Sequence, residues 1–471
     1  MKIYNTMTRK KEEFVPIVPG EAHIYACGPT VYNFIHVGNA RPLVIFDILR
    51  RYLEYRGYKV TYVQNFTDVD DKMIMRAQNE GLTVQQVAEK YIKEYETDAR
   101  GLNIRQADVH PRATQNIDAI IALIQKLEAK GYAYAKGGDV YFRTHADAGY
   151  GKLSHQPLDD LEAGARIEVN DVKEAPMDFT LWKTAKPGEP SWDSPWGKGR
   201  PGWHIECSAM AGRYLGQTID IHGGGQDLIF PHHENEIAQS ECANDAPFAH
   251  YWMHNGYINV DNRKMSKSLH NFFTVRDVAQ KYGYEPIRML MLSAQYRSPI
   301  NYSVDMIEQA QTSIARLTNC RDNLDFLLAK PCPEESAGDD SVIAGFAKRR
   351  AQFIEVMDDD LNTADALAAL FELTRDINTA VADGTASRKV MQAAAKEFDE
   401  LCGVLGILYQ RGNGEDPEEE QIRGLVEKRQ QARKARDFKL ADSIRDELRG
   451  RGIELKDTPQ GVQWTRVGQN H

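Results

Sequence analysis

Apolar residues in the first part of the chain recur with periods that predict a strand, a helix and a second strand. Residues 24–26 form a short apolar run that predicts a buried strand, and a Gly-Pro pair ends it. Apolar positions between residues 43 and 53 then recur at helical spacing until Gly57. Residues 58–63 are rich in strand-forming types. This order predicts a βαβ unit, and we expect Asn39 to cap its helix.

Later segments repeat this alternation around a region of different composition. The pattern predicts a helix over residues 114–130 and strands at 139–143 and 218–221. Residues 149–202 are rich in Gly, Pro and Trp, which indicates an insertion between two halves of one sheet. Beyond residue 284 the apolar spacing becomes helical. The sequence therefore predicts the α/β class, with a helical C-terminal part.

The composition is that of a globular protein with an acidic balance. A hydrophobic fraction of 42% and a charged fraction of 27% are ordinary for such proteins. No apolar stretch approaches the length of a membrane span, and the first residues lack a signal-peptide core, so we expect a cytoplasmic protein with no membrane partner. Six cysteines in 471 residues indicate burial or metal ligation rather than a disulfide framework. The net charge of −10 argues against indiscriminate coating of nucleic acid.

The loop between the first strand and the first helix carries two reactive side chains. Cys27 and His36 lie on this loop, and Gly38 and Asn39 stand at the start of the helix. Backbone N–H groups and the helix dipole at that end favour an anion such as phosphate. Loops of this kind are common in α/β proteins, so the loop alone also fits a purely structural connection.

A second cluster of chemically active residues is the segment 231–236, Pro-His-His-Glu-Asn-Glu. Its proline suits the first turn of a helix, which would place His232 and Glu236 on one face and turn His233 about 100° away. Thiolates from distant loops could complete a four-ligand zinc site with this pair. The candidate thiolates are those of Cys27 and Cys207. Because no CxxC pair and no HExxH pattern is present, capping histidines and buried cysteines remain the alternative.

The segment 261–268 places two lysines three residues apart among small hydroxyl residues. Lys264 and Lys267 could clamp a polyphosphate as point charges on a mobile lid. A solvated charge cluster is the alternative interpretation of this segment.

Taken together, these motifs resemble those of a known enzyme family. His36-Val37-Gly38-Asn39 resembles the HIGH tetrapeptide of class I aminoacyl-tRNA synthetases, and Lys264 to Ser268 matches the second motif of that class in full. Four further segments resemble the cysteinyl-tRNA synthetase family: Cys27–Tyr32, Gly202–Cys207, His222–Gly225 and Pro231–Glu236. The fourth HIGH position is Asn39 rather than His, so roles that need a histidine there cannot be carried over.

The resemblance implies an enzyme that activates L-cysteine with ATP and transfers it to tRNA(Cys). It also implies one zinc ion per subunit, held by Cys27, Cys207, His232 and Glu236. A steric pocket separates cysteine from serine by only about a hundredfold, whereas zinc prefers soft sulfur to a hydroxyl. We expect Glu236 to be the ligand that yields to the substrate sulfur. No separate editing domain is predicted.

The roles of the other site residues follow from the same resemblance. His36, Gly38 and Asn39 would bind the ATP phosphates, with His36 and Asn39 also catalytic. Lys264 and Lys267 would neutralise the pyrophosphate leaving group together with Mg²⁺. The residues implied for the amino-acid pocket are Thr67, Trp203, His222 and Asp227.

The resemblance further implies a Rossmann-like parallel-sheet catalytic domain split by an insertion, then an α-helical bundle and a small C-terminal anticodon-binding domain. The expected ranges are 1–113 and 200–285 for the catalytic halves, 114–199 for the connective insertion, 286–410 for the stem-contact region and helical bundle, and 411–471 for the anticodon-binding domain. Residues 421–456 carry eleven Lys and Arg against six Asp and Glu, which suits contact with RNA. Bases would be stacked and read by Arg433, Asp442, Asp457 and Trp464. We expect a monomer.

Two other classes of protein share parts of this pattern. A ligase that activates cysteine but passes it to a small amine would keep the catalytic half, and the basic C-terminal segment argues against it. A tRNA-binding or regulatory protein without catalysis is the second alternative. The presence of His36, both motif lysines and all four candidate zinc ligands argues against that class.

Overall fold

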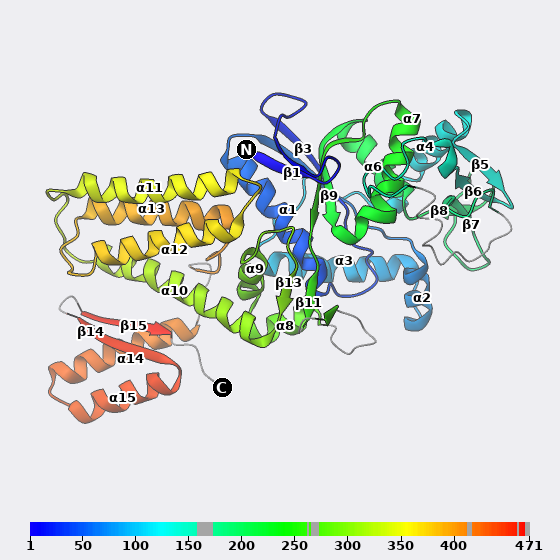
Figure 1. Cartoon of the computed structure of the whole chain (residues 1–471). Coiled ribbons are helices and arrows are strands. Elements are labelled where there is room, and N and C mark those ends of the chain that lie inside the picture. Colours follow the sequence, from blue (N-terminus) through cyan, green and yellow to red (C-terminus); the bar gives the residue numbers. More distant parts are fainter. Residues whose placement is uncertain (158–172, 261–262, 265–272, 412–416, 459–460, 467–471) are drawn as a thin grey trace. The chain divides into compact units, whose positions relative to one another are not determined.

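The computed structural model describes residues 1–157, 173–260, 263–264, 273–411, 417–458 and 461–466. The chain divides into two compact units (Figure 1). The first unit comprises Met1–Val278, Tyr296–Asn301 and Asp359–Leu361, and the second comprises Ala279–Gln295, Tyr302–Asp358 and Asn362–His471. The five expected domain ranges divide the chain more finely, and their boundaries stay predictions.

A four-stranded parallel sheet forms the centre of the first unit. Its strands lie in the order β10–β9–β3–β4. They are β3 (Glu21–Ala26), β4 (Lys59–Gln64), β9 (Ile219–Gly225) and β10 (Ala249–Asn255). Because β3 and β9 are neighbours, residues from either side of the insertion meet at the carboxyl ends of two adjacent strands, where open parallel sheets bind ligands. The predicted α/β class with a divided parallel sheet is confirmed.

Helix α1 (Val37–Tyr55) connects β3 to β4 and completes the predicted βαβ unit. Its apolar positions, among them Val44, Ile48 and Leu49, are fully buried. The expectation that Asn39 caps this helix is wrong. His36 is the N-cap, and Asn39 is the third helical residue of a reciprocal capping box.

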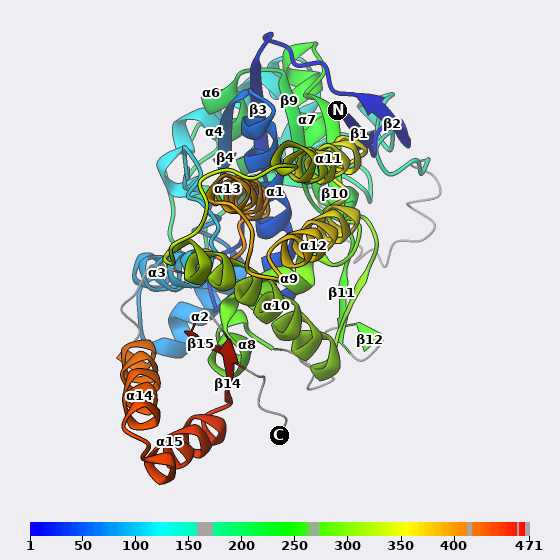
Figure 2. The same cartoon turned by 90° about the vertical axis from the view of Figure 1, so that its left-hand side faces the viewer.

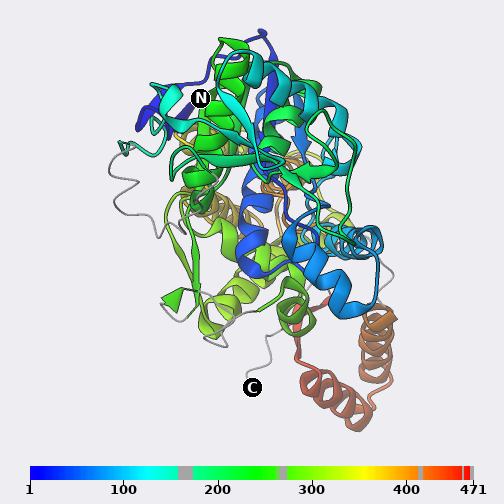
Figure 3. The same cartoon turned by 90° about the vertical axis from the view of Figure 1, so that its right-hand side faces the viewer.

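The insertion folds around its own antiparallel sheet, which faces the viewer in Figure 3. The sheet has the order β5–β6–β7–β8, with β5 (Ala133–Lys136), β6 (Asp139–Phe142), β7 (Phe179–Thr184) and β8 (Gly199–Pro201). Helix α4 (Ile117–Ala129) packs Ile120, Ile124 and Leu127 into the same core as Phe142 and Trp182. The predicted helix and strand of this region are therefore present.

The segments after the insertion carry the second half of the sheet and its helices. Helix α6 (Ile205–Leu215) precedes β9, and α7 (Glu234–Asn244) precedes β10. Strand β9 runs on to Gly225, beyond the predicted end, because Gly224 and Gly225 pair with the last residues of β10. The regular helix begins at Glu234 rather than at the proline, because a wide turn over Ile229–His233 contains one residue in extended conformation.

Other elements lie in the first unit or at the chain positions where the two units divide. They are β1 (Lys2–Asn5), β2 (Lys10–Glu13), α2 (Asp71–Glu80), α3 (Val84–Gly101), β11 (Ile258–Val260), β12 (Arg263–Lys264), α8 (Val275–Tyr282) and β13 (Ile300–Tyr302). Short turns of helix lie at Ala113–Gln115, Thr144–Ala146 and Gln226–Leu228.

The second unit is helical, as the spacing beyond residue 284 predicts. Figure 2 shows its long helices side by side. The helices are α9 (Tyr284–Leu292), α10 (Val304–Leu328), α11 (Asp339–Asp358), α12 (Thr363–Ala380), α13 (Arg388–Leu405), α14 (Pro417–Lys434) and α15 (Phe438–Gly450). The last two pack with the hairpin β14 (Ile453–Thr458) and β15 (Gly461–Arg466). Among the described residues of both units, no helix is long and apolar enough to cross a membrane.

Candidate active site

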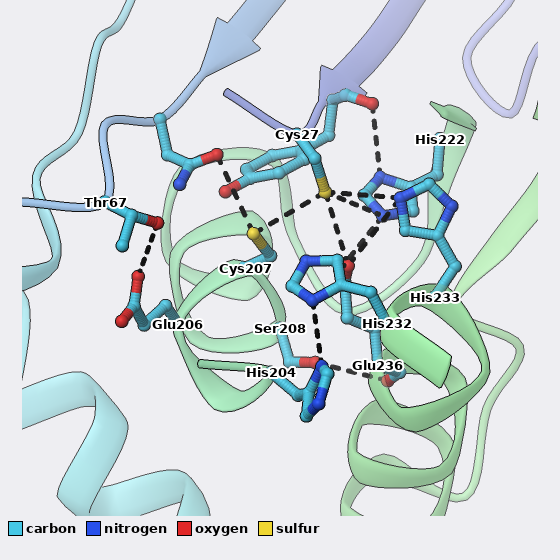
Figure 4. A network of polar contacts seen from close by, with 12 residues as sticks. Cys27, Thr67, His204, Glu206, Cys207, Ser208, His222, His232, His233 and Glu236 are labelled. Carbon is cyan, nitrogen blue, oxygen red and sulfur yellow. Dashed lines mark hydrogen bonds and ion pairs between the residues drawn. The ribbon is translucent and has the colours of Figure 1, made fainter. Parts of the chain in front are cut away.

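Four side chains predicted to bind metal converge at the carboxyl end of the parallel sheet (Figure 4). Cys27 directly follows β3, Cys207 lies on α6, His232 lies in the turn before α7, and Glu236 lies in the first turn of α7. Their ligand atoms all lie within 4.8 Å of one another. The tertiary structure thus gathers the residues of the sequence-based hypothesis at one centre.

The distances between these atoms fit one bound metal ion. The sulfurs of Cys27 and Cys207 are 3.6 Å apart, and two sulfurs on a tetrahedral zinc would be about 3.8 Å apart at the usual bond length. Glu236 Oε1 lies 3.3 Å from the Cys27 sulfur and 3.0 Å from His232 Nε2. The residues present therefore fit a small tetrahedral cation with nitrogen, oxygen and sulfur ligands.

Two of the four groups are ionised in the form that binds a cation. A hydrogen bond from the Cys27 thiol lowers the pKa of Cys207 to about 6, against the opposing effect of burial. Burial would raise the pKa of Glu236, but His222 and His232 outweigh it and hold that pKa well below its ordinary value. Cys207 and Glu236 therefore carry negative charge in a site that is almost fully buried.

A second histidine fixes the orientation of His232. The Nδ1 atoms of His204 and His232 lie 2.9 Å apart. Burial lowers the pKa of His204 well below its ordinary value, so its neutral ring accepts the Nδ1–H of His232. This bond leaves His232 Nε2 facing Glu236, as expected of a histidine that binds a metal through Nε2.

The structure also places two further histidines beside the cluster. Cys27, His222, His233 and Glu236 form an overlapping set whose ligand atoms meet the same distance limit. The prediction that His233 points away from the site is wrong, because its Nε2 lies 3.3 Å from the Cys27 sulfur. The predicted start of a regular helix at the proline gave His233 the wrong direction, since a wide turn stands there instead.

Two of the predicted pocket residues are buried next to this centre. His222 is fully buried, with Nε2 2.9 Å from Glu236 Oε2 and Nδ1 3.1 Å from the carbonyl oxygen of Tyr25. The hydroxyl of Thr67 donates to Glu206 Oε2 at 2.9 Å. Glu206 Oε1 is buried and has no hydrogen-bond partner among the described residues. The sequence analysis assigned Glu206 no role, although it directly precedes Cys207 in the segment Gly202–Cys207.

The other two predicted pocket residues are more exposed. Trp203 is 43% exposed, and its ring centroid lies 4.3 Å from that of His232. It lines a cavity of about 270 Å³ together with Asp70, Arg200 and Glu206. Asp227 lies on the turn Gln226–Leu228 and is exposed. The cavity therefore opens beside the cluster, with an aromatic wall and charged groups of both signs.

The first class motif forms the start of α1. The Nδ1 of His36 accepts a hydrogen bond from the Asn39 backbone N–H at 3.2 Å, and Asn39 Oδ1 accepts from the His36 backbone N–H at 3.4 Å. A side chain at Gly38 would place its Cβ 3.0 Å from the His36 ring, so glycine leaves room for the folded imidazole. Thr274 pairs with His36 through a backbone bridge.

The second motif is only partly within the described residues. Lys264 lies on β12, where its backbone pairs with Asn259 of β11. Lys267 lies outside the described residues, so the arrangement expected for the two lysines stays a prediction.

The residues implied for anticodon binding lie on α14, α15 and the terminal hairpin. Asp457 accepts two hydrogen bonds from Arg429, both at 2.9 Å, and pairs with Arg433 at 2.5 Å. Asp442 pairs with Arg445 at 3.2 Å. Trp464 lies on β15, opposite Leu455 of β14. All four named residues thus lie on one small module.

The chain is similar to known proteins along almost all of its length. A family model described as the tRNA synthetases class I (C) catalytic domain matches residues 13–312, and a DALR domain model matches residues 352–410. The chain is 56% identical over 467 residues to the cysteine–tRNA ligase of Caldicellulosiruptor saccharolyticus, and 56% identical over 471 residues to that of Clostridioides difficile. Each match covers 99% of this chain and 100% of the relative.

Solved structures share the fold at low identity. A Mycobacterium tuberculosis methionyl-tRNA synthetase in complex with methionyl-adenylate matches with a TM-score of 0.60 and 18% identity, covering 82% of this chain and 89% of that one. A ternary LeuRS–tRNA–LeuAMS complex from Agrobacterium radiobacter K84 matches with a TM-score of 0.61 and 11% identity, covering 84% and 85%.

Proposed function

Since the chain belongs to the cysteine–tRNA ligase family of class I synthetases, its reaction is the ATP-dependent joining of cysteine to tRNA, and we propose here how its residues divide that work. The observation that carries the proposal is the meeting of Cys27, Cys207, His232 and Glu236 within 4.8 Å of one another. These residues hold zinc. When bound, zinc supplies a soft Lewis acid that prefers the thiolate of cysteine to the hydroxyl of serine.

The amino acid lies between the zinc ligands and the cavity beside Trp203. The Thr67 hydroxyl donates a hydrogen bond to Glu206, so the lone pairs of its oxygen can accept from the substrate ammonium. Glu206 Oε1, buried and without a partner among the described residues, is a second acceptor on the same side. His222 fixes the orientation of Glu236 through its contact with Oε2. Asp227, which is exposed, pairs with the substrate ammonium.

Adenylate formation needs no protein nucleophile. A carboxylate oxygen of cysteine attacks the α-phosphorus of ATP, the bond to the β-phosphate oxygen breaks, and pyrophosphate leaves. His36, Gly38 and Asn39 bind phosphates at the N-terminus of α1, where the dipole favours them. Lys264 and Lys267 neutralise the leaving pyrophosphate, and Mg²⁺ enters with ATP. The terminal adenosine hydroxyl of tRNA then attacks the adenylate carbonyl, and AMP leaves.

The C-terminal module binds the anticodon of tRNA(Cys). Arg433, Asp442 and Asp457 are exposed on it, and Trp464 lies on its hairpin. Because Arg433 and Asp457 pair with each other, a base that uses either group replaces this ion pair. Replacing Trp464 with Ala is expected to weaken charging of tRNA while leaving cysteine-dependent ATP–pyrophosphate exchange nearly intact. Equal loss of both activities would show that the module only supports the fold.

The proposal places the protein in the cytoplasm. All six cysteines are free, which suits a reducing cytoplasm. The protein acts as a monomer with one zinc ion.

The deciding experiment measures metal content together with adenylate formation for cysteine and serine. One zinc per chain and a preference for cysteine well above a hundredfold are expected. Serine activation equal to that of cysteine in the zinc-loaded protein would overturn the zinc-based selection.

A further inference from the structure

Behind Cys27, three polar side chains form a continuous line that ends near the N-terminus of the chain. His233 Nε2 lies 3.3 Å from the Cys27 sulfur, and His233 Nδ1 lies 2.8 Å from His254 Nε2. His254 Nδ1 in turn lies 2.8 Å from the hydroxyl of Thr6. His233 is fully buried and His254 is 5% exposed, so water does not replace these bonds readily. Figure 4 shows the start of the line, with the His233 ring directed at the Cys27 sulfur.

The position of Thr6 is fixed by the strand that carries His254. The Thr6 backbone N–H donates to the Trp252 carbonyl oxygen at 2.9 Å. The side chain of Asn5 bonds to β10 at two points, donating to the His250 carbonyl oxygen at 2.9 Å and accepting from the Trp252 backbone N–H at 3.1 Å. The N-terminal segment is therefore fastened along β10, which holds the Thr6 hydroxyl opposite the His254 ring.

The direction of the hydrogen bonds follows from the chemistry of Cys27. A thiolate that binds a metal has no proton and only accepts, so His233 Nε2–H must be the donor to it. A neutral imidazole has one donor and one acceptor, so His233 Nδ1 accepts from His254 Nε2–H. His254 Nδ1 then accepts from the Thr6 hydroxyl. Each group of the line donates toward Cys27, and each is satisfied.

We propose that Thr6, His254 and His233 are positioning residues that deliver one hydrogen bond to the Cys27 thiolate and so set how strongly this sulfur binds zinc. A donor on the thiolate fixes the orientation of the sulfur and offsets the cost of burying its negative charge, so zinc binds more tightly. It also withdraws some charge from the sulfur, which keeps the charge-transfer band at higher energy. The inference rests on the proposed zinc site and adds to it a chain of residues that reaches 21 positions upstream of Cys27.

The reverse direction defines the competing arrangement. If His233 were itself a ligand through Nε2, its Nδ1–H would donate to His254, and the line would run toward Thr6 instead. The overlapping set Cys27, His222, His233 and Glu236 would then hold the metal. If His233 is a donor, a residue that only donates a hydrogen bond to the sulfur can replace it without loss of zinc. If His233 is a ligand, such a replacement loses zinc.

The first experiment compares His254→Gln with His254→Leu in the full-length protein, loaded with Zn²⁺ or with Co²⁺. The amide of Gln still donates to His233, whereas Leu does not. We expect the Leu variant to bind Zn²⁺ about 10-fold more weakly and to shift the sulfur-to-cobalt charge-transfer band to lower energy. The Gln variant should remain close to the parent in both measurements. Unchanged affinity and an unchanged band in the Leu variant would overturn the proposal.

A second pair tests the far end of the line and protects against misfolding of the His254 variants. Thr6→Ser keeps the hydroxyl, and Thr6→Val removes it with little change of shape. Only the Val variant should shift the cobalt band, and it should narrow the preference for cysteine over serine in ATP–pyrophosphate exchange. Equal behaviour of the two variants would remove Thr6 from the line.

His233→Gln separates failure of this inference from failure of the zinc site itself. Retention of one zinc in this variant supports His233 as a hydrogen-bond donor to Cys27. Loss of zinc shows that His233 is a ligand and overturns the proposed line of hydrogen bonds. If Cys207→Ser also keeps its zinc, the proposed zinc site fails. If Cys207→Ser loses zinc while His254→Leu keeps the zinc affinity and the cobalt band of the parent, only the proposed line of hydrogen bonds fails.

Discussion

The Nδ1 atom of His36 accepts a hydrogen bond from the backbone N–H of Asn39, at 3.2 Å. One side chain of the first class motif thus caps α1 and stands at the helix end that favours phosphate. With Nδ1 acting as acceptor, the proton of the neutral ring lies on Nε2. Capping is one task of this imidazole, and the phosphate binding that we propose for it is a second, separable one.

Replacing His36 by Asn and by Ala separates these tasks. Asn is a good N-cap, so His36→Asn should keep the free energy of unfolding, whereas His36→Ala should lose about 1 kcal/mol. Both should lose about 100-fold in kcat for adenylate formation, because neither places a ring N–H at the phosphate. Urea unfolding and ATP–pyrophosphate exchange measure the two effects. Full activity of the Asn variant would show that the ring is not needed for chemistry.

Removal of one thiolate should abolish selective binding of zinc. We expect Cys207→Ser to contain less than one zinc per chain and to lose most of its preference for cysteine, down to about the hundredfold that shape alone provides. Cys242→Ser is the matched control, because Cys242 is also buried but packs in the core of the insertion. Metal analysis and exchange assays with both amino acids measure the outcome. Equal zinc loss in both variants would point to general unfolding.

Loss of the Thr67 hydroxyl should affect cysteine binding more than ATP binding. Thr67→Val removes the donor to Glu206, a carboxyl group that is 1% exposed, and should lower the free energy of unfolding by about 1–3 kcal/mol. We expect the KM for cysteine to rise about 10-fold while the KM for ATP stays constant. Thr67→Ser keeps the hydroxyl and serves as the control. A rise in both KM values would contradict a role in the amino-acid pocket.

Asp457 should stabilise the C-terminal module in a pH-dependent way. Hydrogen bonds from Arg429, with further attraction from Arg433, lower the pKa of Asp457 to about 2, against partial burial. A carboxyl with a lowered pKa stabilises the folded state fully above its unfolded pKa, about 4, and loses this contribution as the pH falls through about 2. Asp457→Asn should therefore destabilise the module at neutral pH by about 1 kcal/mol, since the carboxyl is 44% exposed and screened.

Amide hydrogen exchange in β14 and β15 of the full-length protein measures this effect. Protection in the Asn variant should be lower than in the parent at pH 7 and at pH 5. Arg445→Ala, which breaks an exposed pair with Asp442, is the control and should change protection little. The same protection in Asp457→Asn and the parent at pH 7 would refute the assignment.

The sequence alone determined the order of elements and the choice of candidate metal-binding residues. The apolar periods of α1 and of the strands beside it are local properties, because burial on one face needs a fixed spacing. The motif residues Cys27, Cys207, His232 and Glu236 carry their chemistry in their side chains, so the sequence could name a candidate set whose ligand atoms the fold brings within 4.8 Å of one another.

Only the tertiary structure decided how these residues meet and what surrounds them. The pairing of β3 with β9 joins segments nearly 200 residues apart, and no local pattern encodes that contact. The wide turn before α7 directs His233 toward Cys27. The hydrogen bonds between the N-terminal segment and β10 place the Thr6 hydroxyl beside His254. Such contacts depend on packing between distant elements, whereas spacing along one helix or strand reports only which residues share a face.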